Sequence, residues 1–454
     1  MKKLLASFVL WYLRFFARIA LHRNKPAIIG IAGSVGKSSL KNALFVIFVK
    51  FARTKALSGN SETGIPLSIL DLDPHDYSYF SWLKNILKAP FQTNSLRKAQ
   101  YLIAEMGIDD PHPPKNMEYL LNILKPDIAI NLNVSATHSQ QFEKALPRNK
   151  KKTVENLIDL IALEDTKIIT KSQPEIGIYN AENNYIKKYI EEFRKKNTYT
   201  TLLSFGSGKN NSIWLKEYEV DLKKTRFVFH INEKKAREFT LTLRGYILPK
   251  AYADTFAAAI LAARSVKIPL KVIQDALEED FNLPPGRANI FEGIRNSIII
   301  DSTYNSSKES VMTFLELLKD LKKKTKRPAV FVFGDMRELG AAAQDEHREV
   351  AERALAVANQ IYCVGTLTEK YAMPILKNSN KRVYRDASKN SVQLGLHLKE
   401  TLPENAIILL KGSQNEIFLE EAVKFILKNP NDEKMLCRQS EFWKNTKATY
   451  FNLS

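Results

Sequence analysis

The chain has 454 residues, a length that allows two or three domains, because a single core seldom grows beyond about 250 residues. Hydrophobic residues make up 44% and charged residues 26% of the sequence, which excludes disordered, collagen-like and disulfide-scaffold proteins. The net charge of +19 favours polyanionic partners, namely nucleotides, nucleic acid or anionic lipid. Two cysteines, Cys363 and Cys437, are too few for a disulfide framework, so a reducing, cytosol-facing location is expected.

Residues 1–25 are predicted to form an amphipathic helix crowded with large apolar side chains. Arg14 and Arg18 interrupt the apolar run, so a simple transmembrane helix is not expected. A narrow polar stripe follows from the helical spacing of Lys3, Ser7, Arg14, Arg18 and His22. Three interpretations stay open: a helix in the interface of an anionic membrane, a helix packed on the protein body or a partner, and an uncleaved signal-like segment.

A phosphate-binding loop follows this helix. Residues 27–31 are predicted as a buried parallel strand and residues 40–48 as a helix. The loop between them contains Gly33, Ser34, Val35, Gly36, Lys37, Ser38 and Ser39. Its glycines let backbone N–H groups surround phosphate oxygens, while Lys37 is expected to reach the β and γ phosphates and Ser38 to offer its hydroxyl to Mg²⁺. The glycine spacing departs slightly from the common pattern, because position 31 is Ile.

Two further strands end at residues that can bind a metal. Residues 101–104 lead to Glu105, and residues 127–134 lead toward His138. Ligands bind at the carboxyl edge of a parallel sheet, so Glu105 is predicted to hold Mg²⁺ and His138 a second divalent ion or a phosphate. Taken singly, each residue also fits an ordinary surface or capping position.

The remaining chain predicts a second strand and helix series after a β-rich segment. Alternating residues within 214–243 indicate a meander, and the alanine-rich residues 251–264 indicate a helix packed on it. Residues 284–286 are a plausible hinge. Strands are then expected at 298–301, 329–333, 360–364, 382–384 and 406–410. The basic runs 148–152 and 322–327 lack interleaved aromatic residues and are interpreted as solvated surface, so no nucleic-acid partner is expected.

These motifs resemble those of the Mur ligases, in the order in which that family carries them. They are the phosphate loop at 33–39 and the segments 60–66, 105–107, 180–183, 285–287, 334–340 and 411–413, with Asn133, His138, Asp301, Tyr304 and Asn305. Residues 334–340 and 301–306 look most like the MurF type, the UDP-N-acetylmuramoyl-tripeptide:D-alanyl-D-alanine ligase. The resemblance covers nearly everything after residue 26.

The resemblance implies an α/β fold and an activity. A central P-loop NTPase-like domain with a mostly parallel sheet (26–284) would follow the amphipathic helix (1–25) and precede a C-terminal Rossmann-like domain (285–454). The activity would be that of a cytoplasmic, ADP-forming amide ligase of peptidoglycan precursor synthesis, using ATP and Mg²⁺. A muropeptide-like carboxylate would be phosphorylated to an acyl phosphate, which an amine such as D-alanyl-D-alanine would attack.

The resemblance also assigns roles to residues of this chain. Lys37, Glu105, His138 and Arg287 would be catalytic, with Ser38, Glu105 and His138 at the metals. The nucleotide would contact the phosphate loop, Asp301 at the ribose, and Tyr304 and Asn305 near the base. Asn60, Ser61 and Lys411 are candidate substrate residues. A monomer, or a complex with an unidentified partner, is expected.

Three departures from the family pattern leave alternatives open. Only 32 residues precede Gly33, so the usual N-terminal UDP-binding domain is expected to be absent. Asp165 stands where many members have a carbamylated lysine, and Lys167 is the alternative. Tyr246 replaces the usual start of a helix on which Asp254 can stand in for an adenine-contacting Asn. One alternative is therefore a ligase for a lipid-linked or polymeric acceptor, peripheral on the inner membrane face, and another is a nucleotide-binding scaffold without turnover.

Overall fold

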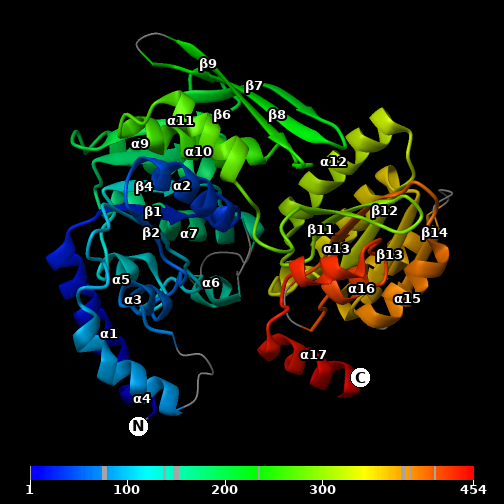
Figure 1. Cartoon of the computed structure of the whole chain (residues 1–454), viewed down its shortest axis with the longest axis horizontal. Helices are drawn as coiled ribbons and strands as arrows, with labels where there is room; N and C mark the ends of the chain where they lie inside the picture. The colour runs from blue at the N-terminus through cyan, green and yellow to red at the C-terminus, as the bar shows by residue number, and fades with distance from the viewer. Residues whose placement is uncertain are drawn as a thin grey trace. The chain divides into compact units, whose positions relative to one another are not determined.

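The computed structural model describes residues 2–73, 79–135, 140–146, 153–233, 236–379, 384–388, 390–413 and 416–453. Contacts divide the chain into two compact units; most of the first is blue to green and most of the second yellow to red in Figure 1. The first comprises Met1–Glu217, Val228–Leu241 and Ala253–Phe281, and the second comprises Tyr218–Phe227, Thr242–Tyr252 and Asn282–Ser454. The sequence placed all of 214–252 in the central domain, whereas the contacts assign the ends of its strands to the second unit.

The first unit carries a long helix, a parallel sheet and the base of a β-ribbon that it shares with the second unit. Its elements are α1 (Lys2–Asn24), β1 (Ala27–Ala32), α2 (Lys37–Phe51), β2 (Thr54–Ala56), α3 (Gly64–Ile69), α4 (Tyr79–Lys88), η1 (Ala89–Gln92), β3 (Tyr101–Glu105), α5 (Met117–Leu121), β4 (Ile128–Asn131), α6 (Gln140–Ala145), α7 (Val154–Asp165), α8 (Lys167–Thr170), β5 (Ile176–Asn180), α9 (Asn184–Arg194), β6 (Thr201–Gly206), β7 (Ile213–Val220), β8 (Lys224–Ile231), β9 (Arg237–Arg244), α10 (Tyr252–Ser265), α11 (Leu270–Asp275) and η2 (Ala276–Asp280).

The strands of this unit follow the order β2-β3-β1-β4-β5-β6-β7-β8-β9 among the described residues. The pairs from β2 to β7 are parallel, as expected for apolar runs separated by helices. The register pairs Ile31 with Glu105 and Ala32 with Asn131. The carboxyl ends of β1, β3 and β4 therefore meet at one edge of the sheet, next to the phosphate loop.

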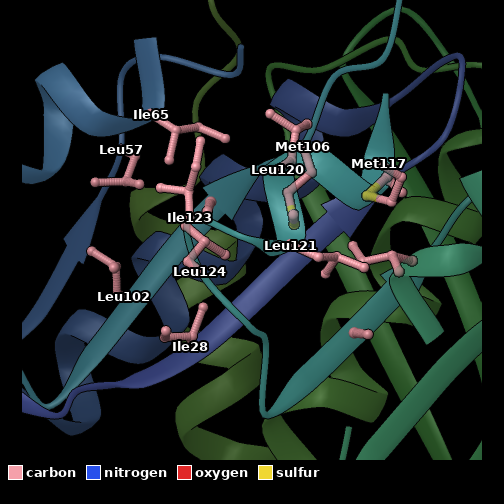
Figure 2. Packing of buried hydrophobic residues seen from close by; sticks show 14 of the residues in the cluster. Ile28, Leu57, Ile65, Leu102, Met106, Met117, Leu120, Leu121, Ile123 and Leu124 are labelled. Atoms are coloured by element: carbon pink, nitrogen blue, oxygen red, sulfur yellow. The ribbon is translucent and has the colours of Figure 1, made fainter. Parts of the chain in front are cut away.

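A hydrophobic core lies between this sheet and the helices that cover it. Figure 2 shows Ile28 of β1 and Leu102 of β3 near Ile123 and Leu124, which follow α5, and near Ile65 of α3. All of these side chains are at most 8% exposed. Burial of such surface is worth roughly 25 cal/mol per Å², so this core is the main support of the phosphate-loop edge.

Helix α1 packs on the first unit through one face. Leu13, Ala17 and Ala20 are fully buried in the core, and the small alanines allow close approach to α3, which α1 contacts. The segment Leu5–Asn24 is also, among the described residues, long and apolar enough to cross a membrane by length and composition. Of the three interpretations of residues 1–25, the structure shows the one in which the helix packs on the protein body.

The second unit is built on a six-stranded sheet. Its elements are β10 (Asn289–Glu292), β11 (Ile298–Ser302), α12 (Lys308–Thr325), β12 (Ala329–Gly334), η3 (Gly340–Ala342), α13 (Ala343–Val357), β13 (Gln360–Val364), η4 (Thr368–Ala372), α14 (Met373–Lys377), β14 (Tyr384–Ser388), α15 (Ser391–Thr401), β15 (Ile407–Lys411), α16 (Glu420–Lys424), η5 (Pro430–Met435) and α17 (Glu441–Leu453). Their order is β10-β11-β15-β12-β13-β14 in the described part of the chain, with only β10 antiparallel. The predicted α/β fold is thus confirmed for both units. Of the strand expected at 382–384, residues 382 and 383 lie outside the described residues, and β14 is described from Tyr384 to Ser388.

Candidate functional site

The phosphate loop is held by the segment that follows β4. Gly33 has φ of +132°, a conformation that favours glycine, and a Cβ there would lie 3.0 Å from Asn133 O. The Ser34 N–H donates to Asn133 O over 2.7 Å, and the Ser135 N–H donates to Ser34 Oγ over 3.0 Å. This double attachment fixes the loop before any phosphate binds.

The start of α2 supplies the groups expected to face phosphate. Lys37 is its first residue, and its Nζ donates to Gly33 O, so the side chain folds back across the loop. Gly36 precedes it without a side-chain cap, which leaves the first backbone N–H groups of the helix without a capping side chain. The uncapped start of α2, with Lys37 beside it, suits an anion at the positive end of the helix dipole.

Glu105 joins β3 to the start of α2. Ser38 Oγ donates to Glu105 Oε2 over 3.2 Å, and Lys41 Nζ lies 2.9 Å from Glu105 Oε1. Glu105 is only 4% exposed, and a buried carboxylate needs a nearby positive charge, which Lys41 supplies. Lys41 was not predicted as a site residue, although its position one turn after Lys37 is a signal by which the sequence could identify it.

The donor set at Ser38 and Glu105 fits Mg²⁺, because both residues offer hard oxygen ligands within reach of each other. No group of three or more His, Cys, Asp or Glu side chains suited to a metal occurs in the described residues. His138, the other predicted ligand, lies outside them. The described chain therefore contributes two oxygen donors, and a bound phosphate or water would have to supply others.

Asp165 lies at the phosphate loop. The Gly33 N–H donates to the Asp165 carboxylate, and Lys37 is close enough for its positive charge to act on the pKa of that carboxylate. Burial raises the pKa of Asp165 to about 7, although the charge of Lys37 acts in the opposite direction. The alternative residue, Lys167, pairs with Glu164 over 2.5 Å. Of the two, Asp165 is the one that reaches the loop.

A network of amides supports the same edge of the sheet. Asn183 Nδ2 donates to Asn133 Oδ1 over 2.7 Å and to Val134 O over 3.1 Å, while its Oδ1 caps α9. Asn131 is fully buried at the end of β4, and both of its side-chain polar atoms lack a hydrogen-bond partner among the described residues. Asn131 was not predicted as a site residue from the sequence, and its place at a strand end was the available signal.

Asp254 lies in the first turn of α10 and accepts a hydrogen bond from Asn180 Nδ2 over 3.2 Å. Burial raises its pKa to about 6, and the nearby charge of Glu182 acts in the same direction. Asp254 therefore contacts the 180–183 motif within the first unit. This position agrees with the expectation that Asp254 stands in for an Asn that contacts adenine.

The candidate substrate residues of the first unit lie beside Glu105. Asn60 O accepts the N–H of Gly107, two residues after Glu105, over 2.8 Å. Ser61 Oγ accepts the N–H of Gly64 over 3.1 Å at the start of α3. The loop that contains Asn60 and Ser61 thus borders the carboxyl end of β3.

In the second unit, the candidate nucleotide residues gather at the end of β11. Asp301 is fully buried, and its Oδ1 accepts from Thr303 N over 3.1 Å and from Thr303 Oγ1 over 2.6 Å. Its Oδ2 has no hydrogen-bond partner in the part of the chain that the structure describes, which leaves an acceptor available for a hydroxyl. Burial raises the pKa of Asp301 to about 6. Asn305 Oδ1 accepts the N–H of Ser306 over 2.8 Å.

Arg287 and Lys411 lie close to this cluster. The Arg287 guanidinium lies 4.5 Å from the centre of the Tyr304 ring, and Gly286 O accepts the Tyr304 N–H over 3.0 Å. Lys411 Nζ donates to Ser302 Oγ over 3.2 Å and to Asn305 O over 3.0 Å. Burial, with the charge of Arg287, lowers the pKa of Lys411 to about 7. All five candidate residues of this unit therefore converge.

A buried ion pair supports this cluster. Arg438 pairs with Glu420 over 2.5 Å and donates to Thr303 O over 3.0 Å and to Tyr304 O over 3.3 Å. Neither Arg438 nor Glu420 was selected from the sequence. They are 18 residues apart, with no local pattern to link them.

Known protein domains match most of the chain. The Mur ligase middle domain matches residues 31–260, and the Mur ligase, glutamate ligase domain matches residues 286–414. The UDP-N-acetylmuramoyl-tripeptide--D-alanyl-D-alanine ligase of Rickettsia prowazekii is 27% identical over 406 residues, which cover 87% of this chain and 78% of that protein. The protein of the same name from Buchnera aphidicola (Baizongia pistaciae strain) is 26% identical, covering 88% and 76%.

Solved structures are similar over nearly the whole chain. MurF ligase from Thermotoga maritima in complex with ADP has a TM-score of 0.70 and 23% identity, covering 95% of this chain and 85% of that one. MurF from Acinetobacter baumannii has a TM-score of 0.69 and 20% identity, covering 91% and 79%. At these identities the structures support the fold of both units.

Proposed function

The chain belongs to the Mur ligase family, and from this premise we propose that it is an ADP-forming amide ligase of the MurF type in peptidoglycan precursor synthesis. The observation that carries the proposal is the meeting of Ser38 and Glu105 beside a pre-formed phosphate loop. The relatives named for D-alanyl-D-alanine addition support this subtype. The substrates proposed are ATP, a muropeptide carboxylate and D-alanyl-D-alanine.

In the proposed reaction the first unit positions the phosphates. The Gly33 and Ser34 N–H groups hold the loop to Asp165 and Asn133, so the backbone N–H groups of 35–36 bind phosphate oxygens, and Lys37 leaves Gly33 O to neutralise charge on the transferred group. The acceptor carboxylate attacks the γ-phosphate, forming an acyl phosphate and ADP, and the amine then displaces phosphate to form the amide. Bringing the reacting groups together accounts for much of the expected acceleration.

Mg²⁺, when bound at Ser38 and Glu105, would neutralise charge on the phosphates. Lys41 would orient Glu105 through its 2.9 Å contact. Asp165 is proposed as the carboxylate that takes the place of a carbamylated lysine, because it reaches Gly33 and Lys37. His138 stays a proposed ligand on the sequence motif alone.

The second unit is proposed to hold the nucleoside. The Oδ2 atom of Asp301 would accept from a ribose hydroxyl, and Tyr304 with Asn305 would border the base. Arg287 would contribute its guanidinium to the phosphates. Lys411, held by Ser302 and Asn305, would bind an anionic or carbonyl group when charged.

The proposal is tested by measuring ADP and phosphate release with each substrate omitted in turn. We expect release only when ATP, the muropeptide carboxylate and D-alanyl-D-alanine are all present. Turnover that is independent of both acceptor and amine would contradict it. ATP binding without turnover under every acceptor would instead support the scaffold without turnover.

A second candidate function is supported by α1. Its Phe8 and Trp11 are 55% and 50% exposed although the helix packs on the protein. Such a surface favours a ligase that meets its acceptor at a membrane, as a lipid-linked or polymeric muropeptide, from a peripheral position on the cytoplasmic face. Replacing the soluble muropeptide by a lipid-linked one in the same assay tests this, since preference for the soluble acceptor would contradict it.

A further inference from the structure

Large apolar side chains are exposed together on α1 and on the segment formed by α4 and η1. Of the seventeen such side chains in the described residues, eight come from these elements. They are Leu5, Phe8, Trp11 and Phe15 of α1, and Phe80, Leu83, Leu87 and Phe91 of α4 and η1. A cluster of eight exposed large apolar side chains is typical of an interaction site, whereas single exposed apolar residues are ordinary.

The two segments are neighbours in the first unit. Helix α1 contacts both α4 and η1, and Figure 1 shows α1 and α4 side by side near the N-terminus. Arg23 of α1 donates to Thr93 Oγ1 over 2.7 Å, and Asn24 Nδ2 donates to Thr93 O over 3.3 Å. These hydrogen bonds attach the end of α1 to the residue that follows η1.

The exposed side chains are not needed by the core. Helix α1 already buries Leu13 and Ala17 in the core, and α4 turns Asn85 inward while Leu83 and Leu87 are 42% and 63% exposed. Leu83 and Leu87 are four residues apart, so they lie on one face of the helix. Leu83 and Leu87 therefore lie on a face of α4 that points to solvent, whereas Trp82 of the same helix packs against the core.

The positive charge of α1, α4 and η1 indicates which kind of partner these exposed side chains bind. Residues 2–25 and 79–100 contain ten Lys and Arg residues and no Asp or Glu, and Arg18, Lys84 and Lys88 are exposed. Exposed aromatic and leucine side chains on segments whose charged residues are all cations match the interface of a bilayer with anionic headgroups. We propose that α1, α4 and η1 form a single docking surface for an anionic lipid bilayer.

This surface is connected to the proposed acceptor side of the active site, a step that rests on the proposed function. Helix α1 packs on α3, which follows the loop of Asn60 and Ser61. The guanidinium of Arg14 lies 5.0 Å from the centre of the Tyr119 ring. Burial raises the pKa of the Tyr119 hydroxyl, and Glu62, which follows Ser61 in that loop, is close enough for its charge to act in the same direction. Docking would bring that loop near the membrane, where a lipid-linked carboxylate acceptor would be presented.

Flotation of the full chain with vesicles tests the docking surface, using phosphatidylcholine alone or mixed with phosphatidylglycerol. We expect binding to the anionic vesicles, weakened by salt. The double substitution Leu87→Ser/Phe91→Ser should lower the partition coefficient at least about tenfold. Tyr199→Ser is the matched control, because Tyr199 is 89% exposed in the same unit and outside the surface. Its partition coefficient should not change.

Charge reversal gives a second, independent comparison. Lys84→Glu/Lys88→Glu should reduce binding to anionic vesicles at least about tenfold, whereas Lys195→Glu/Lys196→Glu, on exposed residues after α9, should reduce it far less. Equal binding to neutral and anionic vesicles, or α4 variants that float like the wild type, would overturn the proposal. A dimer in light scattering that the same substitutions dissociate would overturn it in favour of a second copy. Flotation needs no turnover, so loss of ligase activity would leave this test unaffected.

Discussion

Ser38 Oγ donates to Glu105 Oε2 over 3.2 Å, which joins the second residue of α2 to the last residue of β3. The contact depends on the parallel register that pairs Ile31 with Glu105, because this register brings the end of β3 beside the phosphate loop. The other carboxylate oxygen is held by Lys41. One carboxylate thus connects the strand that carries it to two positions on the phosphate-binding helix.

Glu105→Gln is expected to lower ADP release about 10- to 100-fold at limiting Mg²⁺, because the amide loses the charge that attracts the ion. The measurement is initial rate against Mg²⁺ concentration. A rightward shift of that curve, with an unchanged circular dichroism spectrum, is the expected result. Glu155→Gln, in the first turn of α7, is the control and should leave the curve in place. An unshifted curve for Glu105→Gln would remove Glu105 from the metal site.

Asp165 should make stability depend on pH. Its folded pKa, about 7, lies above its unfolded value, so the folded state binds the proton more tightly. The free energy of unfolding contributed by this group therefore falls as pH rises from about 4 to 7, by a few kcal/mol at most. Asp165→Asn should abolish that contribution, and thermal unfolding midpoints at several pH values should diverge from those of the wild type as pH approaches 7.

The control for this prediction is Asp254→Asn, since burial raises the pKa of Asp254 to about 6 in the same unit. The divergence for Asp254→Asn should level off about one pH unit earlier. Equal midpoint differences at all pH values for Asp165→Asn would contradict a raised pKa. ADP release by the same variant reports separately on the proposed catalytic role.

The local parts of the fold and site were predictable from sequence. Strand β1, the glycines and the start of α2 are consecutive, so hydrophobic runs and glycine positions identify them without tertiary information. The same holds for Glu105, because it directly follows an apolar strand. In the second unit, Asp301 lies one residue before the end of β11 and Lys411 ends the adjacent β15, and the register places Ser302 opposite Lys411.

The long-range parts were not predictable, because no local pattern encodes them. Lys41 meets Glu105 across 64 residues, and Arg438 reaches Thr303 across 135. In α1 packing selected the face of Leu13 and Ala17, which sequence periodicity could not distinguish from the rest of a broad apolar surface. Strand β14 runs on to Ser388, beyond the expected end at 384, because its residues YRDAS are polar and give no apolar run that marks its extent.

Lys411→Met should separate stability from activity. Burial lowers the folded pKa of Lys411 to about 7, below its unfolded value, so the unfolded state binds more protons between about pH 7 and 10. Wild-type stability relative to the variant should therefore increase as pH rises through this range. Unfolding midpoints across it are the measurement. Ligase turnover at pH 7 should fall, because methionine cannot donate to Ser302 and Asn305 or to substrate. A constant midpoint difference would show that the lysine is not perturbed.

Arg438→Met should destabilise the second unit by about 3 kcal/mol, because Glu420 would be left buried with only Lys447 opposite it. Two backbone carbonyls, those of Thr303 and Tyr304, would also lose a donor. Denaturant unfolding followed by fluorescence measures the change. Lys428→Met removes an exposed ion pair with Glu292 and should unfold like the wild type. Equal effects of the two substitutions would show that burial does not strengthen the Arg438 pair.

Gly33→Ala should weaken ATP binding more than it weakens the fold. A side chain at φ of +132° is strained by about 1–3 kcal/mol, and its Cβ would lie 3.0 Å from Asn133 O, so the loop must move away from the segment that holds it. Calorimetric titration with ATP is expected to show at least about a tenfold loss of affinity, since displaced N–H groups no longer converge on the phosphates. Gly245→Ala is the matched control: its φ is +79°, but no atom lies within 4 Å of the added Cβ. That variant should keep its ATP affinity. If both variants bound ATP equally, the contact between Gly33 and Asn133 would not be what shapes the loop.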